Sequence, residues 1–162
     1  MILGIDPGLT GALVLLGDDG EAIHLIHDMP TTTGIQGKRT VDGALLADVV
    51  REALAMTASR EGTRLEAIIE RVNAMPGQGV TSMFSFGQSF GILLGVLGAL
   101  GVRVRLVTPA SWKRQAKLTG QDKDAGRQLA LQLWPEMASH FARKADGGRA
   151  DAALIAYFGR LA

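Results

Sequence analysis

The sequence contains no cysteine and only three histidines in 162 residues. Without cysteine the chain has neither a disulfide framework nor a thiolate zinc site. His24, His27 and His140 are too few and too scattered along the chain to indicate a zinc enzyme. The first residues include no basic stretch followed by a cleavable apolar segment, so no export signal is recognised and we expect a cytoplasmic protein.

The sequence also lacks an uninterrupted apolar run long enough to cross a bilayer. Residues 80–102 carry no formal charge, but serine, threonine and glutamine interrupt the first part of this stretch. Only residues 90–102 are strictly apolar, which is too short for a membrane span. We therefore expect a buried helix here and no membrane partner.

Charge is unevenly distributed, although the formal net charge is only +1. Residues 1–100 hold 6 Lys/Arg and 11 Asp/Glu, a balance of −5, whereas residues 101–162 hold 11 and 5, a balance of +6. The second part is the better candidate for contacting phosphates, with ordinary solvated surface charges as the alternative. With 47% hydrophobic residues, the chain suits a single domain over residues 1–162.

Strand patterns dominate the beginning of the chain and helical patterns its end. Tight turns at Pro7-Gly8 and at 18–20 separate three expected strands, at residues 1–6, 11–16 and 22–27. Residues 31–40 resemble a polar loop. Further strands are expected at 65–72 and 102–108, and helices at 41–59, 81–100, 110–118, 122–133 and 149–161. The order predicts an α/β fold, a five-stranded mixed sheet with its first three strands antiparallel and helices on both faces.

Two acidic residues stand at unusual places in the predicted strands. Asp6 ends the first strand on the face shared by Ile2 and Gly4, although an aspartate that simply starts a turn before Pro-Gly is an alternative. Glu70 interrupts an apolar strand, where a glutamate needs a partner unless it faces water at a sheet edge. Both carboxylates are candidates for a functional site.

A third acid begins the last predicted helix. Asp151 shares a helical face with Leu154, Ile155 and Phe158, whereas a surface aspartate would normally avoid that face. A favourable interaction with the helix dipole is the ordinary explanation. If the first and fourth strands lie side by side and this helix crosses them, Asp6, Glu70 and Asp151 converge. Close carboxylates suit hard cations, and two Mg²⁺ or Mn²⁺ ions per site would support phosphodiester hydrolysis.

Three segments together carry a family resemblance. They are Gly-Ile-Asp-Pro-Gly at 4–8, Ile-Ile-Glu-Arg at 68–71 and Gly-Arg-Ala-Asp-Ala-Ala-Leu-Ile-Ala at 148–156. In order and spacing the chain resembles the RuvC-type Holliday junction resolvases, particularly the small bacteriophage and prophage versions. The resemblance implies an RNase H-like fold and a homodimeric endonuclease. Such an enzyme resolves four-way DNA junctions by paired nicks that leave 5′-phosphate ends, and has no small-molecule substrate.

The resemblance extends to the basic segment after the fifth strand. Lys113 and Lys123 match lysines that contact the scissile phosphate in the family, and Arg114 and Lys117 are candidates for general phosphate contacts. Lysines on the surface of a short helix are the alternative.

The sequence departs from the family at several positions. Asn73 stands where bacterial members commonly carry an aromatic that stacks on bases, so Met75 is the candidate apolar wedge, or a simple contact residue. Gly148 stands where the family usually has a fourth metal ligand. We expect Asp146 to lie outside a final helix that begins near Gly148 or Arg149, and to contribute to the second metal position directly or through water.

Glycines recur every four residues in the helix predicted at 81–100, at Gly87, Gly91 and Gly95. They predict a helix face at or beside a two-fold dimer interface, with close packing against the protomer's own sheet as the alternative.

Three other functions are alternatives: a junction-binding protein without catalysis, a nuclease of broader specificity on branched DNA, or an actin-like ATP-binding protein. The last needs a second domain, for which 162 residues leave no room.

Overall fold

A five-stranded mixed sheet forms the centre of the molecule in the computed structural model, which describes residues 1–34, 37–60, 62–71, 77 and 79–162. The strand order is β3-β2-β1-β6-β7. β1 pairs antiparallel with β2 and parallel with β6, β3 pairs antiparallel with β2, and β7 pairs parallel with β6. The strands are β1 (Ile2–Ile5), β2 (Ala12–Leu16), β3 (Ile23–Asp28), β6 (Glu66–Glu70) and β7 (Arg103–Val107).

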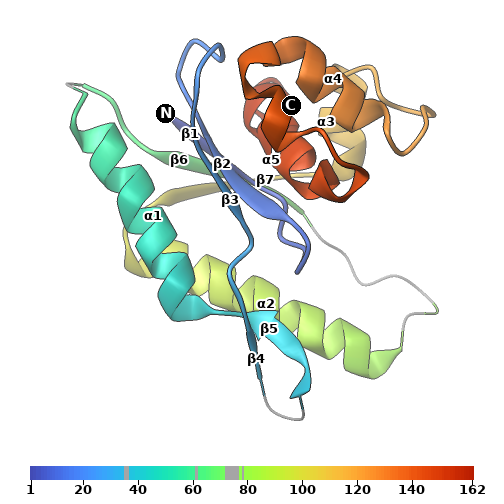
Figure 1. Ribbon diagram of the computed structural model, residues 1–162. Helices are drawn as coiled ribbons and strands as arrows, with labels where there is room; N and C mark the ends of the chain where they lie inside the picture. The colour runs from blue at the N-terminus through green and yellow to red at the C-terminus, as the bar shows by residue number, and fades with distance from the viewer. Residues whose placement is uncertain (35–36, 61, 72–76, 78) are drawn as a thin grey trace.

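Helices cover both faces of this sheet (Figure 1). The bounds of the helices are α1 (Gly43–Ala58), α2 (Val80–Ala99), α3 (Pro109–Gln115), α4 (Ala125–Leu133) and α5 (Gly147–Gly159), with 3₁₀ turns η2 (Pro135–His140) and η3 (Lys144–Asp146). One apolar core joins the sheet to α1 and α2, and the other joins it to α3, α4 and α5. The predicted α/β class, with a mixed five-stranded sheet between helices, is confirmed.

Alternation along β1 divides its residues between the two cores. Leu3 and Ile5 are fully buried toward α1 and α2, whereas Ile2 packs with the core on the α5 side. Gly4 also faces α5, and so closely that a Cβ there would lie 2.1 Å from the carbonyl oxygen of Ala152. Glycine is therefore required at this position, because no side chain fits between strand and helix.

The prediction of a loop at residues 31–40 is wrong. A small antiparallel hairpin forms there, from β4 (Thr31–Thr33) and β5 (Arg39–Val41), and β5 packs against α2. Figure 1 shows this hairpin beside α2, outside the main sheet. The three successive threonines are typical of strands, but the segment lacks the alternating apolar pattern that identifies a half-buried strand.

The prediction of a buried helix within residues 80–102 is also wrong in part. Only Ser89, Leu93 and Leu97 of α2 are buried. Val80 and Phe84 are 79% and 74% exposed, so α2 covers the sheet with one side and leaves an apolar side open. Within the described residues, α2 is the one helix long and apolar enough, by length and composition, to cross a membrane.

Candidate active site

Asp6, Glu70 and Asp151 come together at one end of the sheet. Asp6 directly follows β1 and Glu70 ends the neighbouring strand β6, while Asp151 lies in the first turns of α5, which packs across both strands. The three side chains are near enough for the charge of Asp6 to raise the pKa values of the other two. The structure therefore brings together the three acids that the sequence singled out.

Burial and mutual repulsion disfavour ionisation of these carboxyls. Burial raises the pKa of Asp6, although a hydrogen bond of 3.1 Å from the Gly8 amide to Oδ1 opposes the shift. Burial also raises the pKa of Glu70. Asp151 is affected most, because burial followed by the charges of Asp6 and Glu70 raises its pKa to about 6. Such shifts are common where carboxylates are arranged for function.

The indole of Trp112 holds Glu70 in place. Its Nε1 donates a hydrogen bond of 2.7 Å to Glu70 Oε2, and this bond partly offsets the effect of burial on the glutamate pKa. Trp112 is fully buried in the middle of α3, so the indole has little freedom to move. A buried indole N–H needs a partner. This role of Trp112 cannot be predicted from the sequence, because nothing in the local pattern connects a helix tryptophan to a strand glutamate 42 residues earlier.

Lys113 is the basic residue associated with all three acids. Its positive charge lowers the pKa of each carboxyl against the larger effect of burial. Lys113 and Lys123 both line a cavity of about 360 Å³ whose wall also includes Asp151 and Gly126. Arg114 and Lys117 are exposed on and just after α3, and neither lines this cavity.

Asp146 forms ion pairs with two arginines. It is 2% exposed and precedes α5, which begins at Gly147, so its predicted place outside the helix is correct. However, Arg143 binds its carboxylate through Nη2 at 2.7 Å and Arg149 lies 3.7 Å from it. The hydrogen bonds from Arg143 lower the pKa of Asp146 to about 2. The expected contribution of Asp146 to the metal site therefore has no support in this geometry.

Close packing explains why position 148 carries no acid. A Cβ on Gly148 would lie 2.3 Å from the carbonyl oxygen of Thr10 and 2.9 Å from the Cα of Gly11. The loop after β1 thus occupies the space that a fourth ligand would need. Arg149, the next residue, forms a two-point ion pair with Asp28 at 2.6 and 2.7 Å. Asn73 and Met75 lie outside the described residues.

The site has ligand chemistry suited to hard cations but not a completed metal cluster. Carboxylate oxygens are the donors that Mg²⁺ and Mn²⁺ prefer. Within the described ranges, no group of three His, Cys, Asp or Glu side chains is arranged tightly enough to hold one ion. The three carboxylates are close enough to repel one another but not close enough to share one metal ion, and a bound cation would relieve that repulsion.

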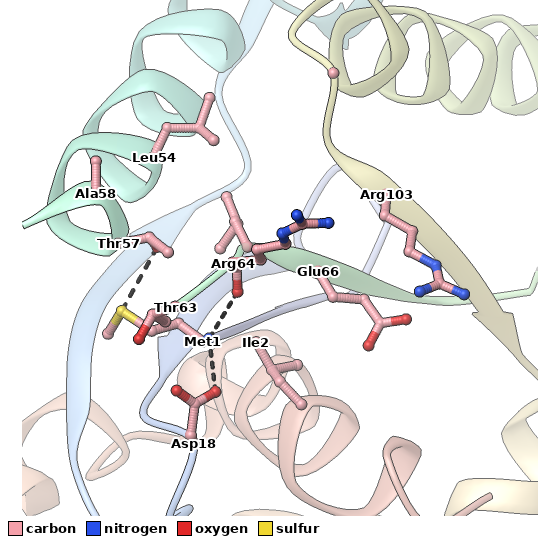
Figure 2. Close-up of a pocket in the computed structure, with 12 residues that line it drawn as sticks. Met1, Ile2, Asp18, Leu54, Thr57, Ala58, Thr63, Arg64, Glu66 and Arg103 are labelled. Carbon is pink, nitrogen blue, oxygen red and sulfur yellow. Dashed lines mark hydrogen bonds and ion pairs between the residues drawn. The ribbon is translucent and has the colours of Figure 1, made fainter. Parts of the chain in front are cut away.

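A larger cavity, of about 660 Å³, lies at the opposite end of the sheet (Figure 2). There the terminal ammonium of Met1 forms an ion pair of 2.6 Å with Asp18 and donates to the Arg64 carbonyl oxygen at 2.8 Å. Glu66 and Arg103, which begin β6 and β7, also line it. Because parallel strands have their first residues at one end and their last at the other, this cavity is remote from the three acids.

Comparison with known proteins gives a consistent result. No family model matches the chain. The chain is 30% identical over 146 residues to "Holliday junction resolvase MOC1, chloroplastic" of Chlamydomonas reinhardtii, an alignment covering 81% of this chain and 17% of the algal protein. The chain therefore spans about a sixth of the length of this relative.

Solved structures give the same fold. The structure of Thermus thermophilus RuvC matches with a TM-score of 0.53 and 16% identity, covering 99% of this chain and 95% of that one. T. thermophilus RuvC in complex with a Holliday junction substrate matches with a TM-score of 0.59 and 16% identity, covering 99% and 94%. The resemblance to RuvC-type Holliday junction resolvases indicated by the motifs is thus confirmed in sequence and in fold.

Proposed function

We propose that this chain is a metal-dependent endodeoxyribonuclease that resolves four-way DNA junctions by paired nicks leaving 5′-phosphate ends. One observation carries the proposal: Asp6, Glu70 and Asp151, distant in sequence, form one electrostatically coupled group with Lys113 in a RuvC-like fold. The names of the similar proteins indicate the substrate, a Holliday junction. We also propose that residues 1–162 form a single nuclease domain.

The chain's own residues would bind the metal and the phosphate separately. Asp6, Glu70 and Asp151 would hold Mg²⁺ or Mn²⁺, two ions per site, with Trp112 fixing the orientation of Glu70. Bound ions of this kind activate the attacking water and stabilise the leaving oxygen in phosphodiester hydrolysis. Lys113 and Lys123 would bind the scissile phosphate from the cavity wall and stabilise its charge. Exposed Arg114 and Lys117 would contact neighbouring phosphates.

The test compares two glutamates of the same strand. Glu70→Gln should abolish cleavage of a four-way junction in Mg²⁺ or Mn²⁺ while junction binding persists, because phosphate contacts remain. Glu66→Gln, at the other end of β6, is the matched control and should cleave like wild type. Three-way and linear duplex substrates in the same assay distinguish a junction resolvase from a broader branched-DNA nuclease. Near wild-type nicking by Glu70→Gln would refute the assignment.

A junction-binding protein without catalysis is the second candidate function. Two observations favour it: Gly148 leaves no room for a fourth ligand, and Arg143 already binds Asp146. The same assay separates the candidates. Tight junction binding by wild type without nicking in either metal would support binding alone.

We also propose that the active form is a homodimer assembled through α2. Val80, Phe84, Gly87, Gly91 and Gly95 follow one open side of this helix, and a Cβ on any of these glycines would meet nothing within 4 Å. Among the described residues the glycines therefore have no packing partner within the protomer, which argues against the alternative of close packing on the protomer's own sheet. Two sites related by a two-fold axis would provide paired nicks.

A membrane is the less suitable partner for this open side, in keeping with a cytoplasmic location. The other side of α2 packs against α1, β5 and β7, so a membrane span would require withdrawing Leu93 and Leu97 from the core.

Light scattering tests the assembly. Gly91→Leu would place a bulky side chain at the middle of the open side and should give a monomer, whereas wild type should be a dimer. Ala44→Leu, an equally large change on the exposed surface of α1, is the control and should remain dimeric. A wild-type monomer, with and without junction DNA, would contradict the proposal.

A further inference from the structure

A groove separates the β4–β5 hairpin from the beginning of α2. Two adjoining cavities of about 330 and 280 Å³ form it, and Lys38, Arg39, Thr81 and Ser85 line both. Figure 1 shows the hairpin alongside this helix, to one side of the main sheet. We refer to these two cavities together as the hairpin groove.

The hairpin groove is basic in the acidic part of the chain. None of the described residues that line either cavity is acidic, although residues 1–100 carry a formal balance of −5. Among the ion pairs of the described residues, none involves Lys38 or Arg39. The positive charge of the groove is therefore not neutralised by a carboxylate of the described part of the protein.

The helix on the other wall adds groups of matching chemistry. α2 starts after Gly79 without a side-chain cap and has no acid in its first turn, so its positive dipole end is uncompensated. Hydroxyls of Thr81, Ser82 and Ser85 lie along the same wall. Amide, hydroxyl, ammonium and guanidinium donors are the groups that bind phosphate oxygens in protein–DNA contacts.

The groove is continuous with the loop that carries Asp6. Leu9, three residues after Asp6, lines one of the two cavities. Arg39 Nη2 donates to the Leu9 carbonyl oxygen at 3.1 Å and to Thr31 Oγ1 at 2.9 Å, so the hairpin is fastened to that loop. Along the helix the groove runs from Thr81 to Gln88, about 10 Å at the helical rise, which exceeds a single phosphate group.

We propose that the hairpin groove binds the sugar–phosphate backbone of one DNA strand next to the active site and positions that arm for cleavage. This rests on the proposed function, since it names a second contact surface for the same substrate. Lys38 supplies the principal phosphate contact, and Arg39 acts as a positioning residue that ties the hairpin to the Asp6 loop. Recognition through backbone phosphates is independent of base sequence.

Fluorescence anisotropy with a labelled four-way junction tests the groove, with Ca²⁺ in place of Mg²⁺ to prevent cleavage. Loss of one phosphate contact lowers the magnitude of the salt slope by about 0.9, equivalent to about fivefold in Kd near 0.15 M salt. Lys38→Ala should show both changes, and Lys38→Glu a larger increase in Kd. Arg103→Ala removes the same charge at the opposite end of the sheet and should bind like wild type.

The outcomes separate the groove from the proposed function. If wild type binds and cuts junctions but Lys38→Ala has the Kd and salt slope of Arg103→Ala, only the groove is refuted. If wild type binds junctions without cutting them, catalysis fails while the Lys38 comparison still decides the groove. If wild type binds no DNA, both proposals are overturned. Thermal unfolding of each variant verifies that the fold is retained.

Discussion

Replacing Asp151 with asparagine should stabilise the metal-free protein at neutral pH. The folded protein raises the pKa of this carboxyl from 3.8 to about 6, mainly by burial and then by the charges of Asp6 and Glu70. Ionisation is therefore harder in the folded than in the unfolded chain. A difference of about two pKa units corresponds to roughly 3 kcal/mol of unfolding free energy at pH 8. Asparagine keeps the shape of the side chain and removes this cost.

The pH dependence follows from the direction of the shift. Because the folded pKa is the higher one, the Asp151 contribution is fully favourable below about pH 3.8 and is lost as pH rises through about 6. The free energy of unfolding of Asp151→Asn should therefore exceed that of wild type by about 2–3 kcal/mol at pH 8, and this difference should disappear near pH 4. Urea unfolding in the presence of a chelator measures this. Asp48→Asn, which alters an exposed carboxylate on α1, should change stability by less than about 0.5 kcal/mol.

Metal addition provides a second measurement on the same pair of proteins. If Asp151 is a ligand, millimolar Mg²⁺ or Mn²⁺ should raise the melting temperature of wild type but not that of Asp151→Asn, since a ligand that binds only the folded state stabilises it. A variant no more stable than wild type at pH 8 without metal would refute the reasoning about burial and repulsion. An equal response of both proteins to metal would refute the ligand assignment.

Three other substitutions test separate features. Asp146→Asn should destabilise the protein at pH 7, because it loses the contacts with Arg143 that lower the pKa of Asp146 to about 2. Since that pKa is depressed, wild type should lose this stability as the pH falls from about 3.8 through 2. Chemical unfolding at several pH values measures the effect. Trp112→Phe removes a hydrogen bond to a carboxylate, which is worth about 1.5–3 kcal/mol, and should raise the Mg²⁺ concentration for half-maximal cleavage about tenfold. An unchanged metal requirement would exclude orientation of Glu70 by the indole. Gly4→Ala should lower the free energy of unfolding by about 3 kcal/mol, because the added Cβ meets the α5 backbone at 2.1 Å; a stable variant would mean that strand and helix separate easily.

The sequence predicted the main elements because each has a strong periodic pattern. The strand containing Ile68 and Ile69 and the helix containing Leu154 and Ile155 are buried as expected, so the acids within them could be assigned to one face. The predicted ends of the helices and strands differ from the observed ends by a few residues, because capping and not periodicity determines where an element ends. The small β4–β5 hairpin was missed because it packs on α2 rather than in the main sheet.

Specific side-chain interactions, whether local or long-range, could not be predicted from periodic patterns. Asp146 was a plausible ligand by position, but Arg143, three residues earlier, forms hydrogen bonds to it from both backbone and side chain. The hydrogen bond between Trp112 and Glu70 depends on how α3 packs against the end of β6, which periodicity does not describe. The glycines of α2 predicted a face at or beside a dimer interface, but the exposure of that face was not predicted, because uncharged residues over the whole helix indicated burial.

The close packing of β1 on α5 also governs when the site can exist during synthesis. Gly4 packs directly against Ala152, so β1 cannot complete its packing until a helix near the end of the chain has been synthesised. A nascent chain that has emerged only as far as α4 contains Asp6 and Glu70 but lacks Asp151 and the helix that covers their face of the sheet. Contacts of such large sequence separation form slowly. The three acids of the proposed site therefore come together only after α5 has been synthesised and has packed on the sheet.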